Sequence, residues 1–293
     1  MSAIHGRFLD MDIRQEIEHA TNAQVTDIVP LSGGCIGQVY RVKLDNGRML
    51  VAKVDANPQP KLDIEGFMLT YLAAHSQLPV PQVYFTTPRL LLMQYLPGNS
   101  HFSSAAQEDA AERLAALHAF SAPQFGLERD SLIGGLHQPN PWTDSWLEFF
   151  AQQRLIYMAN AAVQAGRLSN HVLQRIHHFC EHLACWLEEP LCPALIHGDV
   201  WTTNVLAANG RITGFIDPAI YYADPEIELA FTTLFGTFGD AFFKRYQEIR
   251  PLRPGFFNTR RDIYNLYPLL VHVRLFGGSY VAAVEQTLRR FGY

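Results

Sequence analysis

Two acidic side chains and one amide lie at short intervals near the middle of the sequence. Asp199 and Asn204 are five residues apart, and Asp217 follows Asn204 by thirteen residues. Carboxylate and amide oxygens are ligands that suit Mg²⁺, and phosphoryl transfer also needs a carboxylate that orients the attacking hydroxyl. We therefore predict that Asp199 orients a hydroxyl group and that Asn204 and Asp217 hold Mg²⁺. The alternative for Asp199 is a residue that only caps its loop.

A glycine-rich turn lies far upstream of these residues. It contains Gly33, Gly34, Cys35, Ile36 and Gly37. Because glycine has no Cβ, the backbone N–H groups of such a turn can approach phosphate oxygens closely. The turn is not a Walker A sequence, so an ordinary hairpin turn is the alternative. Together with the residues above, it predicts a loop that binds the phosphates of ATP.

Lys53 lies inside the apolar segment 51–54. A buried ammonium group costs free energy unless a partner compensates it. We expect Lys53 to contact the nucleotide phosphates and to pair with Glu65 of the following helix, and Asp63, with its shorter side chain, is the weaker candidate. The alternative places Lys53 on an edge strand, where its side chain points into solvent.

The surrounding segments predict a small β-rich lobe followed by a larger, mainly helical lobe. Glycine-containing turns at 33–37 and 45–48 separate short apolar segments, which is typical of antiparallel strands. The expected strands cover residues 28–31, 38–44, 49–54, 80–85, 90–95 and 194–196. The expected helices cover residues 61–74, a segment from 103 or 104, a segment from 142 or 146 to 165, and 169–187, with a loop at 130–141. The fold class is therefore α+β, with residues 1–96 as the N-terminal lobe and residues 97–293 as the C-terminal lobe.

Composition and charge exclude several other classes of protein. The 293 residues are 48% hydrophobic and 17% charged, as in ordinary globular proteins. A net charge of −5 without a basic cluster argues against a nucleic-acid surface. Neither a signal peptide nor a membrane span is evident, so we expect a cytoplasmic protein without a membrane partner.

The four cysteines form no CxxC pair, which argues against a disulfide framework. His178, His182 and Cys185 lie at helical spacing and are conceivable ligands of half a metal site. The alternative is a solvated helix face. We favour the solvated face because the sequence shows no second ligand cluster.

The spacing of Asp199, Asn204 and Asp217 resembles the catalytic and metal motifs of protein kinases and of their antibiotic- and choline-kinase relatives. Three further features resemble the fructosamine kinase (ketosamine-3-kinase) family. They are Trp201 two residues after Asp199, the segment 217–224, and the segment 133–142. The resemblance runs nearly from end to end of the chain and implies a protein-kinase-like fold with two lobes.

The same resemblance implies an activity: ATP-dependent phosphorylation of the 3-hydroxyl of a ketosamine, such as a fructosamine or ribulosamine. In that family the phosphorylated adduct sheds its sugar, so the reaction serves deglycation repair. The backbone of Met93, Gln94, Tyr95 and Leu96 resembles the hinge that binds adenine. Two alternatives are a kinase for an aminoglycoside, choline or homoserine, and a non-catalytic, kinase-like protein that binds nucleotides.

Several residues have both a functional and a structural interpretation. Trp201 can lie against a sugar ring, and Trp142 can close the same pocket or pack in the core. In the resembling family a cysteine at the position of Cys35 is associated with redox-sensitive dimerisation, which leaves a monomer and a disulfide-linked homodimer open. Asp224 either supports the catalytic loop or caps a helix. For Trp146 we favour core packing.

Overall fold

The computed structural model describes residues 13–31 and 37–293. Four residues of the predicted phosphate loop, Gly33, Gly34, Cys35 and Ile36, therefore lie outside the described residues. Gly37 is described and has φ +71°. A Cβ at this position would lie 2.3 Å from the carbonyl oxygen of Val54, so the close approach of the two backbones requires glycine.

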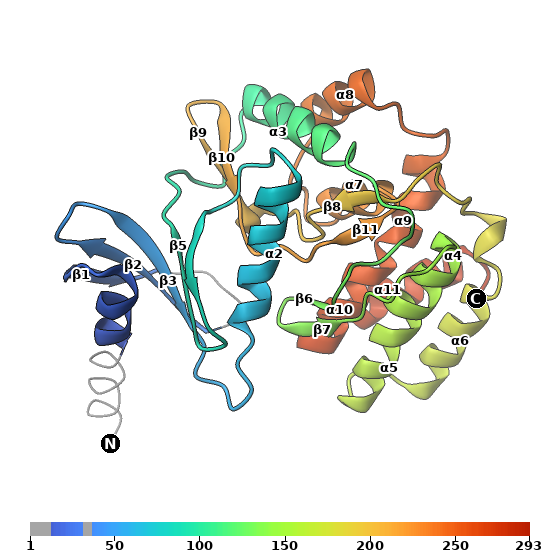
Figure 1. The fold of residues 1–293 in the computed structure, drawn as a ribbon. Helices are drawn as coiled ribbons and strands as arrows, with labels where there is room; N and C mark the ends of the chain where they lie inside the picture. Colours follow the sequence, from blue (N-terminus) through green and yellow to red (C-terminus); the bar gives the residue numbers. More distant parts are fainter. Residues whose placement is uncertain (1–12, 32–36) are drawn as a thin grey trace.

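The N-terminal part is a five-stranded antiparallel sheet with the order β1-β2-β3-β5-β4 (Figure 1). Its strands are β1 (Val25–Pro30), β2 (Gln38–Leu44), β3 (Met49–Val54), β4 (Val83–Thr86) and β5 (Leu90–Gln94). The bounds of β2 and β3 were predicted correctly. β4 begins three residues later than expected, because Pro79 and Pro81 cannot donate to a strand ladder.

Alternation along β3 directs Lys53 to one face of this sheet. Leu50, Ala52 and Val54 pack against a helix whose described part covers residues 13–21 and which was not predicted from the sequence. Val51 packs on the opposite face with α2 (Leu62–His75). Since successive side chains of a strand point to opposite faces, Lys53 shares the face of Val51 and points towards α2.

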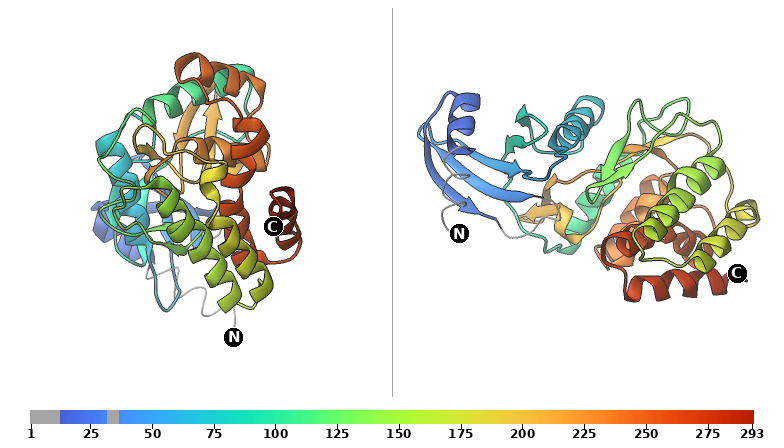
Figure 2. Two further views of the ribbon diagram at one scale, coloured as in Figure 1. Left: turned by 90° about the vertical axis from the view of Figure 1, so that its right-hand side faces the viewer. Right: turned by 90° about the horizontal axis from the view of Figure 1, so that it is seen from below.

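The rest of the described chain is mainly helical, with three two-stranded antiparallel sheets (Figures 1 and 2). Two of them are hairpins, β6 (Ser131–Ile133) with β7 (Leu136–Gln138) and β9 (Val205–Ala208) with β10 (Arg211–Phe215), and the third pairs β8 (Ala194–Ile196) with β11 (Tyr221–Ala223). The helices are α3 (Ser104–Leu117), α4 (Trp146–Phe149), a π-helix (Phe150–Ile156), α5 (Tyr157–Gln164), α6 (Asn170–Cys180), α7 (Glu226–Leu234), α8 (Asp240–Ile249), a second π-helix (Phe256–Arg260), α9 (Arg261–Tyr264), α10 (Leu266–Phe276) and α11 (Ser279–Arg290), with 3-10 turns at Leu183–Cys185 and Thr202–Asn204.

Two expectations for the helical part were wrong. The expected loop at 130–141 contains the β6–β7 hairpin, whose turn at Gly134 and Gly135 has positive φ at both residues. The expected helix 169–187 ends at Cys180, and only a 3-10 turn follows. The α+β fold class itself is confirmed, since an antiparallel sheet precedes a mainly helical region.

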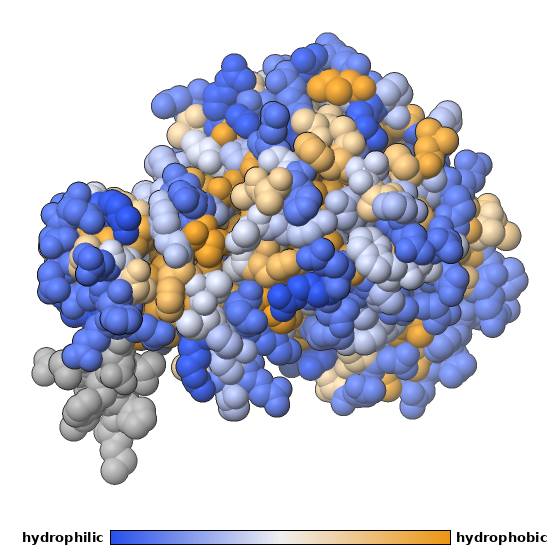
Figure 3. Space-filling model, viewed as in Figure 1, coloured by the Kyte–Doolittle hydropathy of each residue, from blue (hydrophilic) through white to orange (hydrophobic). Residues whose placement is uncertain are grey.

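One large core joins the helical part to α2. Met68 and Leu72 of α2 are buried together with Trp146, which has no exposed surface, as the sequence predicted. The face of the molecule in Figure 3 is largely hydrophilic, with apolar residues in scattered patches. Among the described residues, every helix is too short or too polar to cross a lipid bilayer.

Candidate active site

Lys53 contacts two carboxylates from distant parts of the chain. Its Nζ donates to Oε1 of Glu65 on α2 at 2.6 Å and forms an ion pair with Oδ1 of Asp217. Lys53 and Glu65 are 7% and 8% exposed, so this pair is buried. Because Asp217 follows β10, the lysine connects the N-terminal sheet to the helical part of the chain.

The two carboxylates decide the charge state of Lys53. Burial alone would lower the pKa of its ammonium group, but the negative charges of Asp217 and Glu65 outweigh burial and raise the pKa above its ordinary value. The ammonium group is therefore charged at neutral pH. Such a fixed positive charge between the two parts of the chain suits the phosphates of a nucleotide.

Asp199 and Asn204 are hydrogen-bonded to each other across the 3-10 turn at Thr202–Asn204. The Asn204 Nδ2 donates to the Asp199 carboxylate at 2.8 Å and to its backbone carbonyl at 3.1 Å. The loop begins directly after β8, at Gly198, with φ +84°. A Cβ on Gly198 would lie 2.1 Å from the carbonyl oxygen of Ala219, so this loop packs tightly against the turn after Asp217.

The environment favours the protonated form of Asp199. Burial, and then the charge of Asp217, raise the pKa of its carboxyl to about 8, and the hydrogen bond from Asn204 opposes both effects. A divalent cation beside Asp217 would offset this repulsion and lower the pKa of Asp199 towards its ordinary value. The repulsion between the ionised carboxylates of Asp199 and Asp217 is thus an electrostatic reason for a cation at this position.

The donor atoms around Asp217 suit Mg²⁺. Asp217 lies two residues after the end of β10 and has φ +54°, in the left-handed region that non-glycine residues rarely adopt. The Nδ2 of Asn204 donates to Asp199, so its Oδ1 does not take part in that hydrogen bond. This Oδ1 accepts the Thr203 hydroxyl at 3.4 Å. Carboxylate and amide oxygens are hard ligands, so these residues fit the predicted metal.

Glu228 on α7 supports the loop that carries Asp199. Its Oε1 accepts the Gly198 N–H at 2.6 Å, and its Oε2 lies 2.8 Å from Nε2 of His118. The His118 Nδ1 in turn lies 2.7 Å from the hydroxyl of Tyr246, and all three side chains are buried. Glu228 was not predicted from the sequence. Its position between the apolar residues Ile227 and Leu229 could have indicated it, because a buried carboxylate needs a partner.

Asp224 is a helix cap. Its Oδ1 accepts the Glu226 N–H at 2.9 Å at the start of α7, and its Oδ2 accepts the Tyr264 hydroxyl at 2.8 Å and an Arg253 N–H. The sequence left capping and support of the catalytic loop open for this residue. The described contacts of Asp224 favour capping, and Glu228 holds the loop instead.

A small cavity lies beside Asp199. Its lining includes Gly198, Tyr221, Phe231, Tyr267 and His272. The His272 ring lies 5.0 Å from Phe235, and Phe235 lies 5.7 Å from Trp201, so aromatic rings continue from the cavity to Trp201. Tyr267 and His272 were not predicted from the sequence, because the pattern of α10 is that of an ordinary apolar helix.

The two tryptophans that were expected near the substrate have different surroundings. Trp201 packs beside Phe235, whereas Trp142 is 43% exposed and lies 6.2 Å from Tyr222. The Tyr222 hydroxyl is 3.2 Å from that of Tyr71 on α2. Trp142 therefore lies where the helical part meets α2, and no described ring contact joins it to Trp201.

The expected adenine hinge leads from β5 into the helical part. Met93 is buried beside Leu69 of α2, and the Gln94 N–H donates to the Gln82 carbonyl at 2.8 Å. Tyr95 and Leu96 follow the end of the strand and are half-buried. A Cβ on Gly214 would lie 2.1 Å from the Leu96 side chain, so this segment packs closely on β10.

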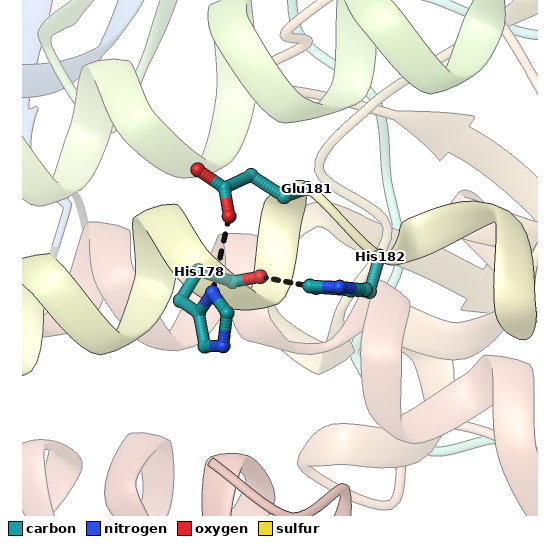
Figure 4. Close-up of side chains that lie close together, drawn as sticks. All are labelled: His178, Glu181 and His182. Atoms are coloured by element: carbon teal, nitrogen blue, oxygen red, sulfur yellow. Dashed lines mark hydrogen bonds and ion pairs between the residues drawn. The ribbon is translucent and has the colours of Figure 1, made fainter.

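The histidine cluster on α6 lies at the surface (Figure 4). The His178 Nδ1 is 3.0 Å from Oε2 of Glu181, and the His182 Nδ1 is 2.9 Å from the His178 carbonyl oxygen. Glu181, and not Cys185, completes the cluster among the described residues. The exposure of His178 and Glu181 agrees with a solvated helix face.

Comparison with known proteins assigns the family. The family described as fructosamine kinase matches residues 9–291. A probable ketoamine kinase from Synechocystis sp. is 34% identical over 289 residues, which is 95% of each chain. One from Vibrio parahaemolyticus is 33% identical over 273 residues, covering 91% of this chain and 93% of the relative.

Solved structures agree in fold. A crystal structure assigned as a fructosamine-3-kinase from Thermobifida fusca has a TM-score of 0.85 and 30% identity, covering 94% of this chain and 97% of that chain. An aminoglycoside phosphotransferase, in ternary complex with ADP and hygromycin B, has a TM-score of 0.69 at 18% identity, covering 96% and 99%. The predicted kinase-like fold is thereby confirmed. This chain belongs to the fructosamine kinase family, phosphotransferases that act on an alcohol group.

Proposed function

We propose that this protein uses MgATP to phosphorylate a sugar hydroxyl of a ketosamine, a fructosamine or ribulosamine, as a step of deglycation repair. The observation that carries the proposal is the meeting of Lys53, Glu65 and Asp217, beside a loop in which Asn204 is bonded to Asp199. The family membership supports the ketosamine, and the nucleotide complexes of the aminoglycoside phosphotransferases support ATP.

The roles of the individual residues follow from this arrangement. Residues 1–96 would bind the nucleotide, with adenine at Met93, Gln94, Tyr95 and Leu96 and the phosphates at the glycine-rich turn and Lys53. Glu65 keeps the lysine in place. Residues 97–293 would carry the acceptor site.

Asn204 and Asp217 would hold Mg²⁺, which neutralises phosphate charge when it is bound. Asp199 would accept a hydrogen bond from the attacking hydroxyl and thereby orient it towards the terminal phosphate. Little proton transfer is needed early in such a reaction, so orientation is the main task of this carboxylate. Asn204 fixes the carboxylate through the 2.8 Å hydrogen bond.

The sugar would lie between Asp199 and the aromatic side chains that begin at Trp201. An indole face provides a flat apolar surface for a sugar ring. Trp142 would contribute from the side of α2, where its ring is 43% exposed.

An acceptor screen tests this function. The protein is incubated with MgATP and fructosamines, ribulosamines, aminoglycosides, choline and homoserine, and phosphate transfer to each acceptor is followed by mass spectrometry. We expect phosphorylated ketosamine, and transfer only to one of the other alcohols would reject the substrate.

Two variants test the roles. Asp199→Asn should abolish turnover and leave ATP binding largely intact, whereas Asp217→Asn should weaken metal-dependent nucleotide binding. Near-normal rates in both variants would refute the assignments.

A further inference from the structure

We propose that Gln138 is a positioning residue for the turn that begins at Asp217. The inference rests on the proposed function, because it concerns the residue that would bind the metal. Gln138 is the last residue of β7 and has no exposed surface. The sequence predicted a loop at 130–141, but in the structure Gln138 ends a strand and its side chain contacts Ala219.

The amide of Gln138 is held in one orientation. Its Nε2 donates to the carbonyl oxygen of Ala219 at 3.0 Å and to the Ser131 hydroxyl oxygen at 2.7 Å. Its Oε1 accepts the hydroxyl of Tyr267 at 2.6 Å. Because a backbone carbonyl can only accept a hydrogen bond, Gln138 must present its NH₂ group to Ala219.

Ala219 is two residues after Asp217 and is tied on both sides. Its N–H donates to the carbonyl of His197 at 2.7 Å, and its carbonyl accepts from Gln138. Gly198 packs against the same carbonyl so closely that a Cβ would lie 2.1 Å from it. The turn is thus held between the loop of Asp199 and the β6–β7 hairpin.

Asp217 needs this support because its own backbone conformation is unfavourable. A non-glycine residue with φ +54° persists only where the surrounding structure enforces it. The Ala219 ties lie directly after this residue, and the Ile216 N–H donates to the Asn204 carbonyl at 2.9 Å directly before it. Loss of the Gln138 bond would release one end of the turn and let the Asp217 carboxylate move.

A rigid layer supports Gln138 from behind. The Asn140 Nδ2 donates to the Ser131 hydroxyl oxygen at 2.8 Å, and its Oδ1 accepts from Arg154 at 2.6 Å. Arg154 is fully buried, with its guanidinium 3.8 Å from the centre of the Tyr221 ring. These contacts leave the hairpin little freedom, so it can hold Ala219 at a fixed distance.

Gln138→Met tests the proposal, because methionine has a similar length and no donor. Binding of a non-hydrolysable ATP analogue is measured by calorimetry, with a Mg²⁺ titration and with EDTA. Changes in residues that orient a metal ligand lower metal affinity about 10- to 100-fold. We expect a loss of this size in the Mg²⁺-dependent binding and a far smaller change in the metal-free binding.

A control separates positioning from general damage. Gln124→Leu removes a surface amide that donates to Asp144. This variant should retain the wild-type Mg²⁺ requirement. If Gln138→Met does not fold, Gln138→Leu, which also lacks a donor for the Ala219 carbonyl, carries the same expectation.

Three outcomes would overturn the inference: wild-type Mg²⁺-dependent affinity in the Gln138 variants, an equal loss of metal-free and metal-dependent binding, or the same metal defect in Gln124→Leu. Failure of the proposed function is distinguishable, since the wild-type protein itself would then show no Mg²⁺-dependent binding of the nucleotide.

Discussion

Replacing Asp199 by asparagine should stabilise the ligand-free protein, and the gain should grow with pH. Folding raises the pKa of this carboxyl from 3.8 to about 8, because it is buried and faces Asp217. Between these two values the folded state binds more protons than the unfolded state. The free energy of unfolding therefore falls as pH rises through this window, and an uncharged side chain escapes the loss.

The size of the effect follows from the shift. At about 1.4 kcal/mol per pKa unit, a shift from 3.8 to about 8 corresponds to at most about 6 kcal/mol. Asp199 is half-buried rather than sealed from solvent, so screening reduces the expected gain to about 1–2 kcal/mol above pH 8. For a chain of this size that corresponds to a rise in melting temperature of about 2–3 °C.

Scanning calorimetry without nucleotide or metal, at about pH 5 and about pH 8.5, measures this difference. Asp144→Asn, a change at an exposed carboxylate, serves as the control and should alter the melting temperature little at either pH. A melting temperature of Asp199→Asn at or below that of the wild type at the higher pH would refute the reasoning. So would a gain of equal size at both pH values.

Three further perturbations test other parts of the site. Gly198→Ala should lower the free energy of unfolding by about 2 kcal/mol or more, since its Cβ meets the Ala219 carbonyl. Gly166 has φ +69° and open space around it, so Gly166→Ala measures the cost of the backbone conformation alone. Urea unfolding measures both variants, and equal losses of stability would contradict the steric argument. Trp201→Ala should raise the acceptor KM about tenfold without changing the KM for ATP, and unchanged acceptor kinetics would place the ring outside the pocket. Cys35→Ala should resist inactivation by peroxide if a disulfide-linked dimer forms through this thiol, and sensitivity equal to wild type would remove that hypothesis.

Much of the local structure could be predicted because it depends on neighbouring residues. The turn at 45–48 and the apolar alternation around it predicted β2 and β3 with correct bounds. The pairing of Lys53 with Glu65 of the following helix was also predicted, and the structure places the two side chains 2.6 Å apart. The spacing of Asp199, Asn204 and Asp217 likewise singled out the residues that the structure groups around one loop and one turn.

Contacts between distant segments could not be predicted in this way. Glu228 holds Gly198 from 30 positions away, and His118 contacts Glu228 across 110 positions. Gln138 reaches Ala219 across 81 positions, and its segment was expected to be a loop. In each case a polar side chain is buried by an element that the local pattern does not specify.

The sequence alone therefore determined which residues of the candidate site carry charge, oxygen atoms and aromatic faces, and several of the strands and helices that carry them. The tertiary structure decided which polar groups hold these residues in place, and that Trp142 and Trp201 have separate neighbours. The physical reason is that strand alternation and helix periodicity act over a few residues. The partners of a buried polar group, in contrast, depend on how whole elements pack together.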